Sequence, residues 1–341
     1  MKAVATNQTN NKVVLGAYLV VYFVWGSTFF FIHKALSDFT PFVLGSLRFF
    51  AASMILLTYC KMRGYKIFNK QVVKQACITG FLLLFIDMGA LIWAEQHVSS
   101  GIAAIMAAAA ALWFIILDKP QWKHNFSSLP IILGLILGFV GVIMLFAEQI
   151  TIAGDESQRL LNIFCMVLLI LGSIAWTVGS LYSKYSKAKN ENKGEDLHVM
   201  VKTSWQMITA GVLFTVVALL NGEYAQFDVY EISASGWFSL VYLITFGSIL
   251  AFGSYIWLIQ NRPVTEVSTY AYVNPVVAVA LSYFFTDDII TSLQIGGLVV
   301  VLLSVGLMNW DLYKGSKVFK KVFSKKRSLD ARDEEQLNMS N

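Results

Sequence analysis

The stretch AEQITIAGDESQR, residues 147–159, divides the chain into two sets of apolar segments and decides the fold. It is polar and acidic, whereas five long apolar stretches precede it and five follow it. A helix that spans a bilayer needs about 20 mostly apolar residues, and each stretch is long enough. Because five is an odd number, the second set would enter a membrane from the face opposite the first. The sequence therefore predicts two inverted halves, a construction that many secondary transporters share.

The composition of the 341 residues is that of an integral membrane protein. Apolar residues make up 57% and charged residues 14%, and the mean hydropathy of +0.62 lies outside the range of soluble globular proteins. We predict an all-α membrane protein with ten transmembrane helices in two inverted five-helix repeats. The predicted spans lie near residues 13–33, 41–61, 74–94, 99–117, 128–147, 160–184, 199–220, 236–260, 264–285 and 291–312. The first span lacks a small-residue cleavage site, so we expect a retained helix rather than a signal peptide.

The spans and the charges between them predict five regions. These are a cytoplasmic tail (1–12), a first five-helix repeat (13–147), an outer acidic linker (148–159), a second five-helix repeat (160–312) and a basic cytoplasmic tail (313–341). With the N-terminus placed inside, almost all of the 26 Lys and Arg residues fall on the cytoplasmic side, and the outer loops are acidic. This bias predicts a multi-pass protein of the cell membrane, interpreted as the bacterial inner membrane, with both termini cytoplasmic.

The two halves share a pattern of residues. Residues 89–96 read GALIWAEQ and residues 253–260 read GSYIWLIQ, so that Gly, Ile, Trp and Gln coincide at an offset of 164. Trp25 in the first span similarly corresponds to Trp176 in the sixth. Small residues of the fifth and tenth spans also correspond, namely Gly134, Gly138 and Gly141 with Gly296, Gly297 and Ser304. Their common order favours a duplication.

Several motifs resemble EamA-type transporters of the drug/metabolite transporter superfamily. They are WGSTF at 25–29, RF at 48–49, AE at 94–95, SGIAA at 100–104 and STYAYVNP at 268–275. The resemblance covers about residues 13–312. It implies ten helices in two inverted repeats, both termini in the cytoplasm, and a central substrate cavity lined by spans 1, 3, 4, 6, 8 and 9. Export is the direction that the resemblance implies.

The sequence departs from this family in the fourth span. Relatives carry a Pro that corresponds to Pro275 in the ninth span, and Ala111 stands at that position here. Because a Pro removes a backbone donor and kinks a helix, its absence predicts a straighter fourth helix. It also puts in question the symmetry of gating between the halves and the family's usual substrate range.

Three charged residues lie within or at the ends of predicted spans. Arg48 and Asp87 lie at similar depths below the outer surface, so an ion pair between them is possible. Two roles stay open for this pair: orienting helices, or facing the substrate or a coupled proton. Glu95 is either a solvated helix end or a carboxylate of the outer vestibule that binds cations or exchanges protons.

Aromatic and small polar residues within the spans are candidates for the substrate cavity. Aromatic faces bind apolar and cationic solutes. The Asn274-Pro275 step frees a backbone carbonyl, a feature of transporter sites and also of simple packing kinks. The candidates are Trp25, Thr28, Trp93, Trp176, Ser180, Tyr255, Trp257, Tyr270, Tyr272 and Asn274. Anchoring at the membrane interface is the alternative for the tryptophans, above all Trp93, and helix packing is the alternative for the small residues.

Other classes of protein lack support in the sequence. There is no HExxH or GxSxG motif and no close pair of acids in mid-membrane, so we do not expect an enzyme. There is no GxxxxGK[ST] loop, so we expect neither ATP hydrolysis nor an ATPase subunit. Cys60, Cys77 and Cys165 are scattered without metal-ligand spacing, and we expect no metal and no cofactor. The net charge of +5 reflects topology, so no nucleic-acid partner is expected.

We therefore predict a secondary transporter whose partners are a small solute and the lipid bilayer. The solute is a small organic metabolite or drug-like compound, such as an amino acid or related molecule, and it crosses by alternating access. A passive channel or a lipid scramblase is the alternative, because a cavity between inverted repeats can also stay open. Dense Gly and Ala stripes, which indicate tight helix packing, favour the carrier.

Overall fold

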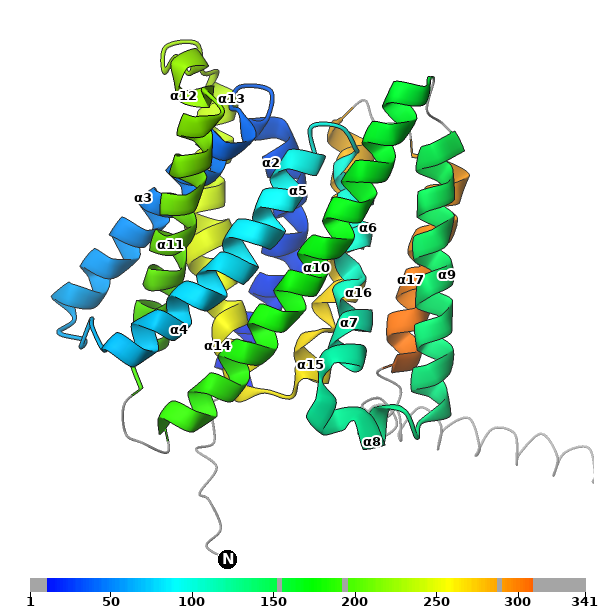
Figure 1. The fold of residues 1–341 in the computed structure, drawn as a ribbon, viewed down its shortest axis with the longest axis horizontal. Coiled ribbons are helices and arrows are strands. Elements are labelled where there is room, and N and C mark those ends of the chain that lie inside the picture. Colours follow the sequence, from blue (N-terminus) through cyan, green and yellow to red (C-terminus); the bar gives the residue numbers. More distant parts are fainter. Residues whose placement is uncertain (1–10, 152–154, 192–195, 287–289, 309–341) are drawn as a thin grey trace, which may run out of the picture.

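Helices make up all of the regular secondary structure in residues 11–151, 155–191, 196–286 and 290–308, which the computed structural model describes. They run back and forth between the two ends of one bundle (Figure 1). Seven of these helices are long and apolar enough to cross a membrane: Lys12–Ala35, Pro41–Met62, Lys70–Ala94, Ser100–Leu117, Glu156–Lys187, Val199–Leu220 and Ala234–Asn261. Three shorter apolar helices are Leu129–Leu145, Val273–Phe285 and Ser292–Met308. The all-α membrane class is thus confirmed, and the count of ten spans stays a prediction.

The first half of the chain contains the following elements: α1 (Asn11–Leu19), η1 (Val20–Val24), α2 (Trp25–Ala35), α3 (Pro41–Met62), α4 (Lys70–Gly80), η2 (Phe81–Asp87), α5 (Met88–Ala94), α6 (Ser100–Ala108), α7 (Ala110–Leu117), η3 (Lys119–Gln121), α8 (Trp122–Asn125) and α9 (Leu129–Thr151). The second half contains α10 (Glu156–Glu191), α11 (Val199–Leu220), α12 (Glu223–Gln226), α13 (Ala234–Tyr242), η4 (Leu243–Phe252), α14 (Gly253–Asn261), α15 (Val264–Val267), α16 (Tyr270–Phe285) and α17 (Ser292–Met308). In Figure 1 the end of the bundle that carries α12 is its upper end, and the end that carries α8 is its lower end.

Three helices contain a π-helical stretch, namely η1, η2 and η4. The backbone hydrogen bonds of a π-helix span five residues rather than the four of an α-helix, and such turns are frequent at functional sites. The offset of 164 that relates the two halves carries residues 81–87 to residues 245–251, which lie within η4. The irregularity therefore recurs at corresponding places of the third and eighth predicted spans.

The fourth predicted span is interrupted at Ala109, between α6 and α7. The amide N–H of Ala109 donates to the carbonyl of Met106 (3.0 Å), and that of Leu112 donates to the carbonyl of Ala109 (2.9 Å). Both bonds span three residues rather than four, as in a tighter turn. The run of alanines therefore forms a tight turn without a proline, and the straighter fourth helix expected from Ala111 stays a prediction.

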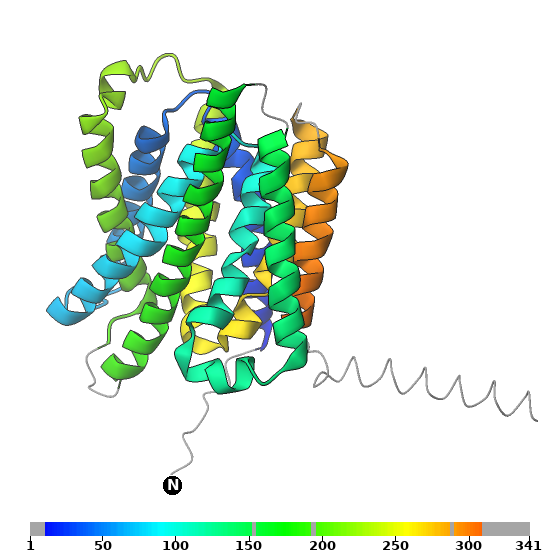
Figure 2. The ribbon, with the colours of Figure 1, turned by 45° about the vertical axis from the view of Figure 1, so that its right-hand side comes forward.

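Small residues let α9 and α17 approach closely along one edge of the bundle, where the two helices stand side by side (Figure 2). A Cβ atom on Gly138 would lie 2.5 Å from the Oγ of Ser304, and one on Gly134 would lie 2.8 Å from the carbonyl oxygen of Ser304. A Cβ on Gly141 would lie 2.8 Å from Val301. Helices in lipid associate by such close van der Waals packing, since burying apolar surface gains nothing there.

The outer surface of α9 is apolar. Leu133, Ile136, Val140 and Ile143 are all exposed and recur every three to four residues, which places them on one face of the helix. Water would disfavour a face of this kind, whereas lipid accommodates it. The helix therefore packs one face against α17 and offers the other to lipid.

Carboxylates link the two halves at the upper end. The Glu223 carboxylate accepts from the backbone N–H groups of Phe42 (2.9 Å) and Val43 (3.1 Å) in the first turn of α3. Asp38 accepts from the hydroxyl of Ser233 (2.7 Å), the residue that caps α13. A negative charge at the positive end of a helix dipole is stabilising, so Glu223 also caps α3 from the other half of the chain.

Candidate functional site

A cavity lies between helices of both halves of the chain. It is lined mainly by apolar and aromatic side chains with a few polar groups, as sites for small organic ligands are. Six of the residues predicted from the sequence line it: Trp25, Thr28, Asp87, Trp176, Tyr270 and Asn274. They come from α2, η2, α10 and α16, and α5, α6 and α7 complete the wall.

An aromatic cluster forms one side of this cavity. The ring of Trp25 lies 5.1 Å from Trp176, 4.9 Å from Tyr255 and 5.6 Å from Tyr270, between ring centroids. Trp176 and Tyr255 also contact each other at 4.8 Å. The two tryptophans that correspond in the sequence thus meet in space, one from each half of the chain. We name Trp25, Trp176, Tyr255 and Tyr270 the aromatic cluster.

Close packing of α2 on α16 holds Trp25 in place. A Cβ atom on Gly26 would lie 2.7 Å from Val277 and 3.1 Å from the Cα of Asn274, so only glycine allows this approach. With its amide nitrogen turned toward η1, Asn274 donates to the carbonyls of Val21 (3.2 Å) and Tyr22 (2.8 Å). The π-helical stretch therefore has a hydrogen-bond donor from the ninth predicted span.

Asp87 is the last residue of η2 and reaches the cavity. Its Oδ1 lies 3.1 Å from the place that a Cβ atom on Gly172 of α10 would occupy. It interacts electrostatically with Tyr255 and Tyr270. Within the part of the chain that the structure describes, it makes no hydrogen bond and no ion pair. A carboxyl group thus faces the cavity without a basic side chain beside it.

Arg48 does not pair with Asp87 in the described structure, so that part of our expectation is wrong. Only 2% of Arg48 is exposed, and its Nε donates to the Oγ of Ser248 in η4 (2.8 Å). It interacts electrostatically with Glu95. The reason is geometric: α3 packs against η4, which directs the guanidinium to Ser248, whereas Asp87 faces α10.

Glu95 ends α5 and is only 1% exposed, so it is not a solvated helix end. Its backbone carbonyl contacts the Nδ1 of His33 at 3.1 Å. The Glu95 carboxylate interacts electrostatically with Arg48, and Glu95 does not line the cavity. The buried charges therefore separate into Arg48 with Glu95 on one side and Asp87 in the cavity on the other.

Four predicted residues lie outside the cavity wall. Trp93 packs on Phe164 at 5.3 Å between ring centroids. Trp257 lines a different cavity of about 750 Å³. Ser180 and Tyr255 share a hydrogen bond of 2.6 Å directly behind Trp176, so they support the wall without forming it. A further candidate from the sequence is Tyr272, and its side chain is not among those that the structure describes.

The remaining wall residues were not predicted, namely Phe29, Met88, Leu91, Ala107, Ala110 and Ser173. Three of the six lie one helical turn from a residue that was predicted: Phe29 from Trp25, Leu91 from Asp87 and Ser173 from Trp176. Helical periodicity was the signal available to find them.

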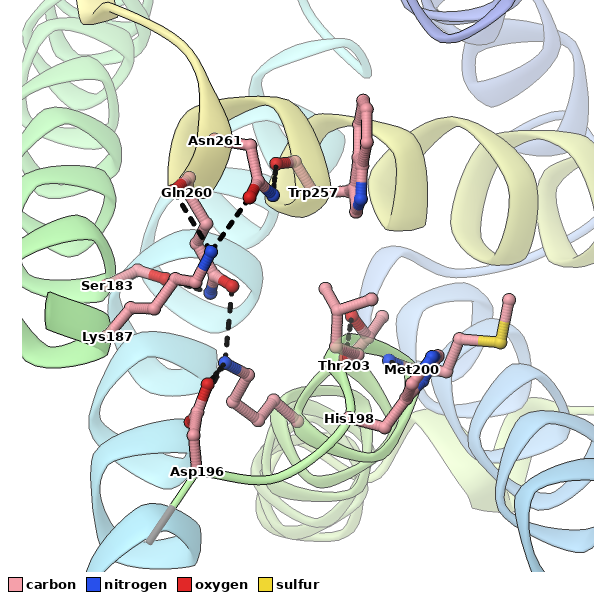
Figure 3. A network of polar contacts seen from close by, with 11 residues as sticks. Ser183, Lys187, Asp196, His198, Met200, Thr203, Trp257, Gln260 and Asn261 are labelled. Carbon is pink, nitrogen blue, oxygen red and sulfur yellow. Dashed lines mark hydrogen bonds and ion pairs between the residues drawn. The ribbon is translucent and has the colours of Figure 1, made fainter. Parts of the chain in front are cut away.

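A polar network joins α10, α11 and α14 at the lower end (Figure 3). The Nζ of Lys202 forms an ion pair with Asp196 (2.9 Å) and donates to the Oε1 of Gln260 (3.2 Å). The Nε2 of Gln260 donates to the Oγ of Ser183 (3.1 Å). The Nζ of Lys187 donates to the backbone carbonyl of Gln260 (3.3 Å). Because Ser183 follows Ser180 by one turn of α10, this network lies just below the aromatic cluster.

Proteins of known sequence and structure resemble this chain along most of its length. The inner membrane transporter YedA of Escherichia coli (strain K12) is 30% identical over 309 residues, which cover 88% of this chain and 92% of YedA. The WAT1-related protein At3g02690, chloroplastic, of Arabidopsis thaliana is 22% identical over 304 residues, which cover 85% of this chain and 67% of that protein. A crystal structure of another protein, 14% identical, superposes with a TM-score of 0.59 over 87% of this chain and 96% of that one, and so shares the fold.

The EamA-like transporter family matches the chain twice, over residues 12–147 and 163–310. These segments overlap the predicted repeats, 13–147 and 160–312. Together with the apolar helices and the transporter relatives, they establish a multi-pass membrane transporter. The chain belongs to the EamA-like transporter family.

Proposed function

We propose that this chain is a secondary transporter that binds one small organic solute in the central cavity and carries it across by alternating access. The observation that carries the proposal is the cavity itself, whose wall joins Trp25 of the first half to Trp176 of the second. A site at the junction of two repeats can open to either side when one half moves against the other. The solute is a small metabolite or drug-like compound, as the mainly apolar and aromatic lining of the cavity favours.

The arrangement of ten spans as two inverted repeats supports this mechanism and is part of the proposal. Three observations favour it. The family matches the chain twice, and π-helical stretches occur at corresponding places. The start of α1 and the end of α17 lie at the same end of the bundle, its lower end (Figure 1). We propose that this lower end is cytoplasmic, that the membrane is the bacterial inner membrane, and that the direction is export.

The polar contacts at the two ends favour a carrier over an open channel or a scramblase. At the upper end Glu223 and Asp38 tie the halves together, and at the lower end Lys202 and Gln260 join three helices below the aromatic cluster. The upper contacts join the two halves and the lower contacts join helices of the second half, and an open pore would need neither set. A carrier needs them, because each end must close while the other is open.

Flux measurements in proteoliposomes test the proposal. A panel of radiolabelled amino acids, nucleosides and organic cations would be offered to the full chain, and uptake would be measured against unlabelled solute inside. We expect saturable uptake of at least one compound, accelerated by the same compound on the far side. The variant Ala107→Phe, which places a large ring in the cavity, should abolish the flux while its thermal unfolding stays cooperative. A rate that rises linearly with concentration, equal for all solutes, would show a pore instead.

A further inference from the structure

The central cavity combines a single acid with an aromatic wall. Among the described residues that line it, Asp87 is the only charged one. The other wall residues are aromatic, aliphatic or small and neutral. We infer that the cavity selects solutes carrying a positively charged nitrogen, with Asp87 as the counter-charge and the aromatic cluster as the surface against which the cation packs. This inference rests on the proposed function and names its substrate class.

The position of Asp87 leaves its charge available to a solute. No described basic side chain forms an ion pair with it, since Arg48 is engaged with Ser248 and interacts with Glu95. A carboxylate inside the membrane is unfavourable unless it is paired or faces water. A cationic solute supplies the missing partner at the moment of binding, so its binding also relieves an unfavourable buried charge.

The aromatic cluster is placed for the same chemistry. Trp25, Trp176 and Tyr270 line the cavity that Asp87 also lines, and Tyr255 packs behind them. The negative face of an aromatic ring attracts a cation within about 6 Å of its centroid, most strongly for Trp and where water is excluded. An ammonium group in this cavity would meet a carboxylate on the η2 side and ring faces on the side of α2, α10 and α16.

The arrangement also excludes the opposite preference. An anionic solute would need a basic side chain in the wall, and no described lining residue is basic. Asp87 would repel such a solute at short range. A neutral solute would gain the ring contacts but would leave the carboxyl without a partner. The cavity therefore discriminates among aromatic compounds of one size by their charge.

Calorimetric titration of the purified full chain in a neutral detergent tests this preference with three probes of similar size. Benzyltrimethylammonium is the cation, N-benzylacetamide the neutral control and 3-phenylpropionate the anionic control. We expect measurable binding of the ammonium and at least about tenfold weaker binding of the other two. Equal binding of the cation and the neutral compound, or no binding of the ammonium, would overturn the inference.

Substitutions locate the preference. Asp87→Asn keeps the shape of the side chain and removes its charge, and it should weaken ammonium binding about 30-fold or more. Asp87→Glu should retain most of it. Trp176→Leu should weaken it about fivefold to thirtyfold. Glu148→Gln is the matched control, because Glu148 is a buried acid of α9 outside this cavity, and its affinity should equal that of the unaltered chain.

The outcome separates this inference from the transport function. Unchanged ammonium affinity in Asp87→Asn would overturn the role of Asp87. The charge preference would be overturned, and the carrier left intact, by two results together. An uncharged solute would show saturable flux that Ala107→Phe blocks, and the ammonium probe would not bind. Linear, unselective flux together with tight ammonium binding would instead overturn the carrier and leave the binding site.

Discussion

The hydrogen bond between Ser180 and Tyr255 gives the sharpest test of how the cavity wall is held. Tyr255 is 0% exposed, and its hydroxyl lies 2.6 Å from that of Ser180. Its ring contacts Trp25 at 4.9 Å and Trp176 at 4.8 Å. Tyr255→Phe removes the hydroxyl and keeps the ring, so the loss of the hydrogen bond is separated from the loss of the wall.

The expected magnitude follows from the burial of both partners. Hydrogen bonds between helices in membranes contribute about 0.6 kcal/mol on average and about 1.7 at most. A hydroxyl left buried without a partner costs about 1–3 kcal/mol. Because Ser180 can still turn toward a carbonyl of its own helix, we expect Tyr255→Phe to lower the free energy of unfolding by about 1–2 kcal/mol. Solute affinity should change little, since every ring contact remains.

A double-mutant cycle measures the energy of the hydrogen bond between Ser180 and Tyr255 directly. Thermal or denaturant unfolding in a fixed detergent would be recorded for Ser180→Ala, Tyr255→Phe and the double variant. We expect a coupling energy of about 1 kcal/mol, so that the double variant is less destabilised than the sum of the singles. Strictly additive losses would refute the idea that this bond braces the cavity wall. Tyr255→Leu, which also removes the ring contacts, should in addition weaken solute binding.

Three further substitutions follow from the packing and the caps. Gly80→Ala should destabilise the protein by about 1–3 kcal/mol in thermal unfolding, because the new Cβ would lie 2.4 Å from a backbone oxygen of α11. The control is Gly16→Ala, whose Cβ would meet nothing within 4 Å, so it should be neutral or stabilising. Equal effects of the two substitutions on stability would contradict the role of close packing at Gly80. Glu223→Gln should lower stability by about 0.3–1 kcal/mol through the lost charge at the first turn of α3, and an unchanged melting temperature would speak against the cap. Burial and the nearby charge of Lys202 lower the pKa of His198, whose Nδ1 accepts from the first turn of α11. The folded state thus resists protonation of His198, so stability should be lost as the pH falls below about 6.5. His198→Asn should show a smaller loss, and identical pH profiles would refute the role of the imidazole.

The all-α membrane class and several residues of the cavity wall could be predicted because they depend on quantities that a sequence carries directly. Apolar length predicts helices that cross a membrane, and aromatic residues within these helices are candidates for a binding cavity. Trp25 and Trp176 are the clearest case, since a correspondence in the sequence became a contact of 5.1 Å. Thr28 and Tyr270 line the same cavity.

The pairing of charges could not be predicted in the same way. Counting residues gives the depth of Arg48 and Asp87, but contact also requires that the two side chains point toward each other. The π-helical stretch η2 ends at Asp87, so the regular rotation of an α-helix does not hold along the third predicted span up to this residue, and no pattern in the sequence indicated it. The Arg48 side chain instead points to Ser248.

The interruption at Ala109 has a similar origin. Alanine has the highest helix propensity, so the run from Ala107 to Ala111 argued for an unbroken helix. Tertiary packing overrides this preference. Ala108, Ala109, Ala110 and Ala111 are almost completely buried, and Thr177 of α10 approaches the Ala110 carbonyl at 3.4 Å. A donor from another helix can stabilise a turn that the local sequence alone does not favour.

Labelling of a single cysteine in the cavity is the most direct test of the central claim that one solute site opens to each side of the membrane in turn. Ala107→Cys would be introduced into a chain whose Cys60, Cys77 and Cys165 have been replaced, in sealed membranes exposed to an impermeant thiol reagent from one side or the other. We predict that the cysteine is labelled from both sides and that a transported solute slows the labelling rate from both. A substitution that favours closure of one side should slow the labelling rate from that side. Labelling from one side only, whatever the solute, would contradict the claim.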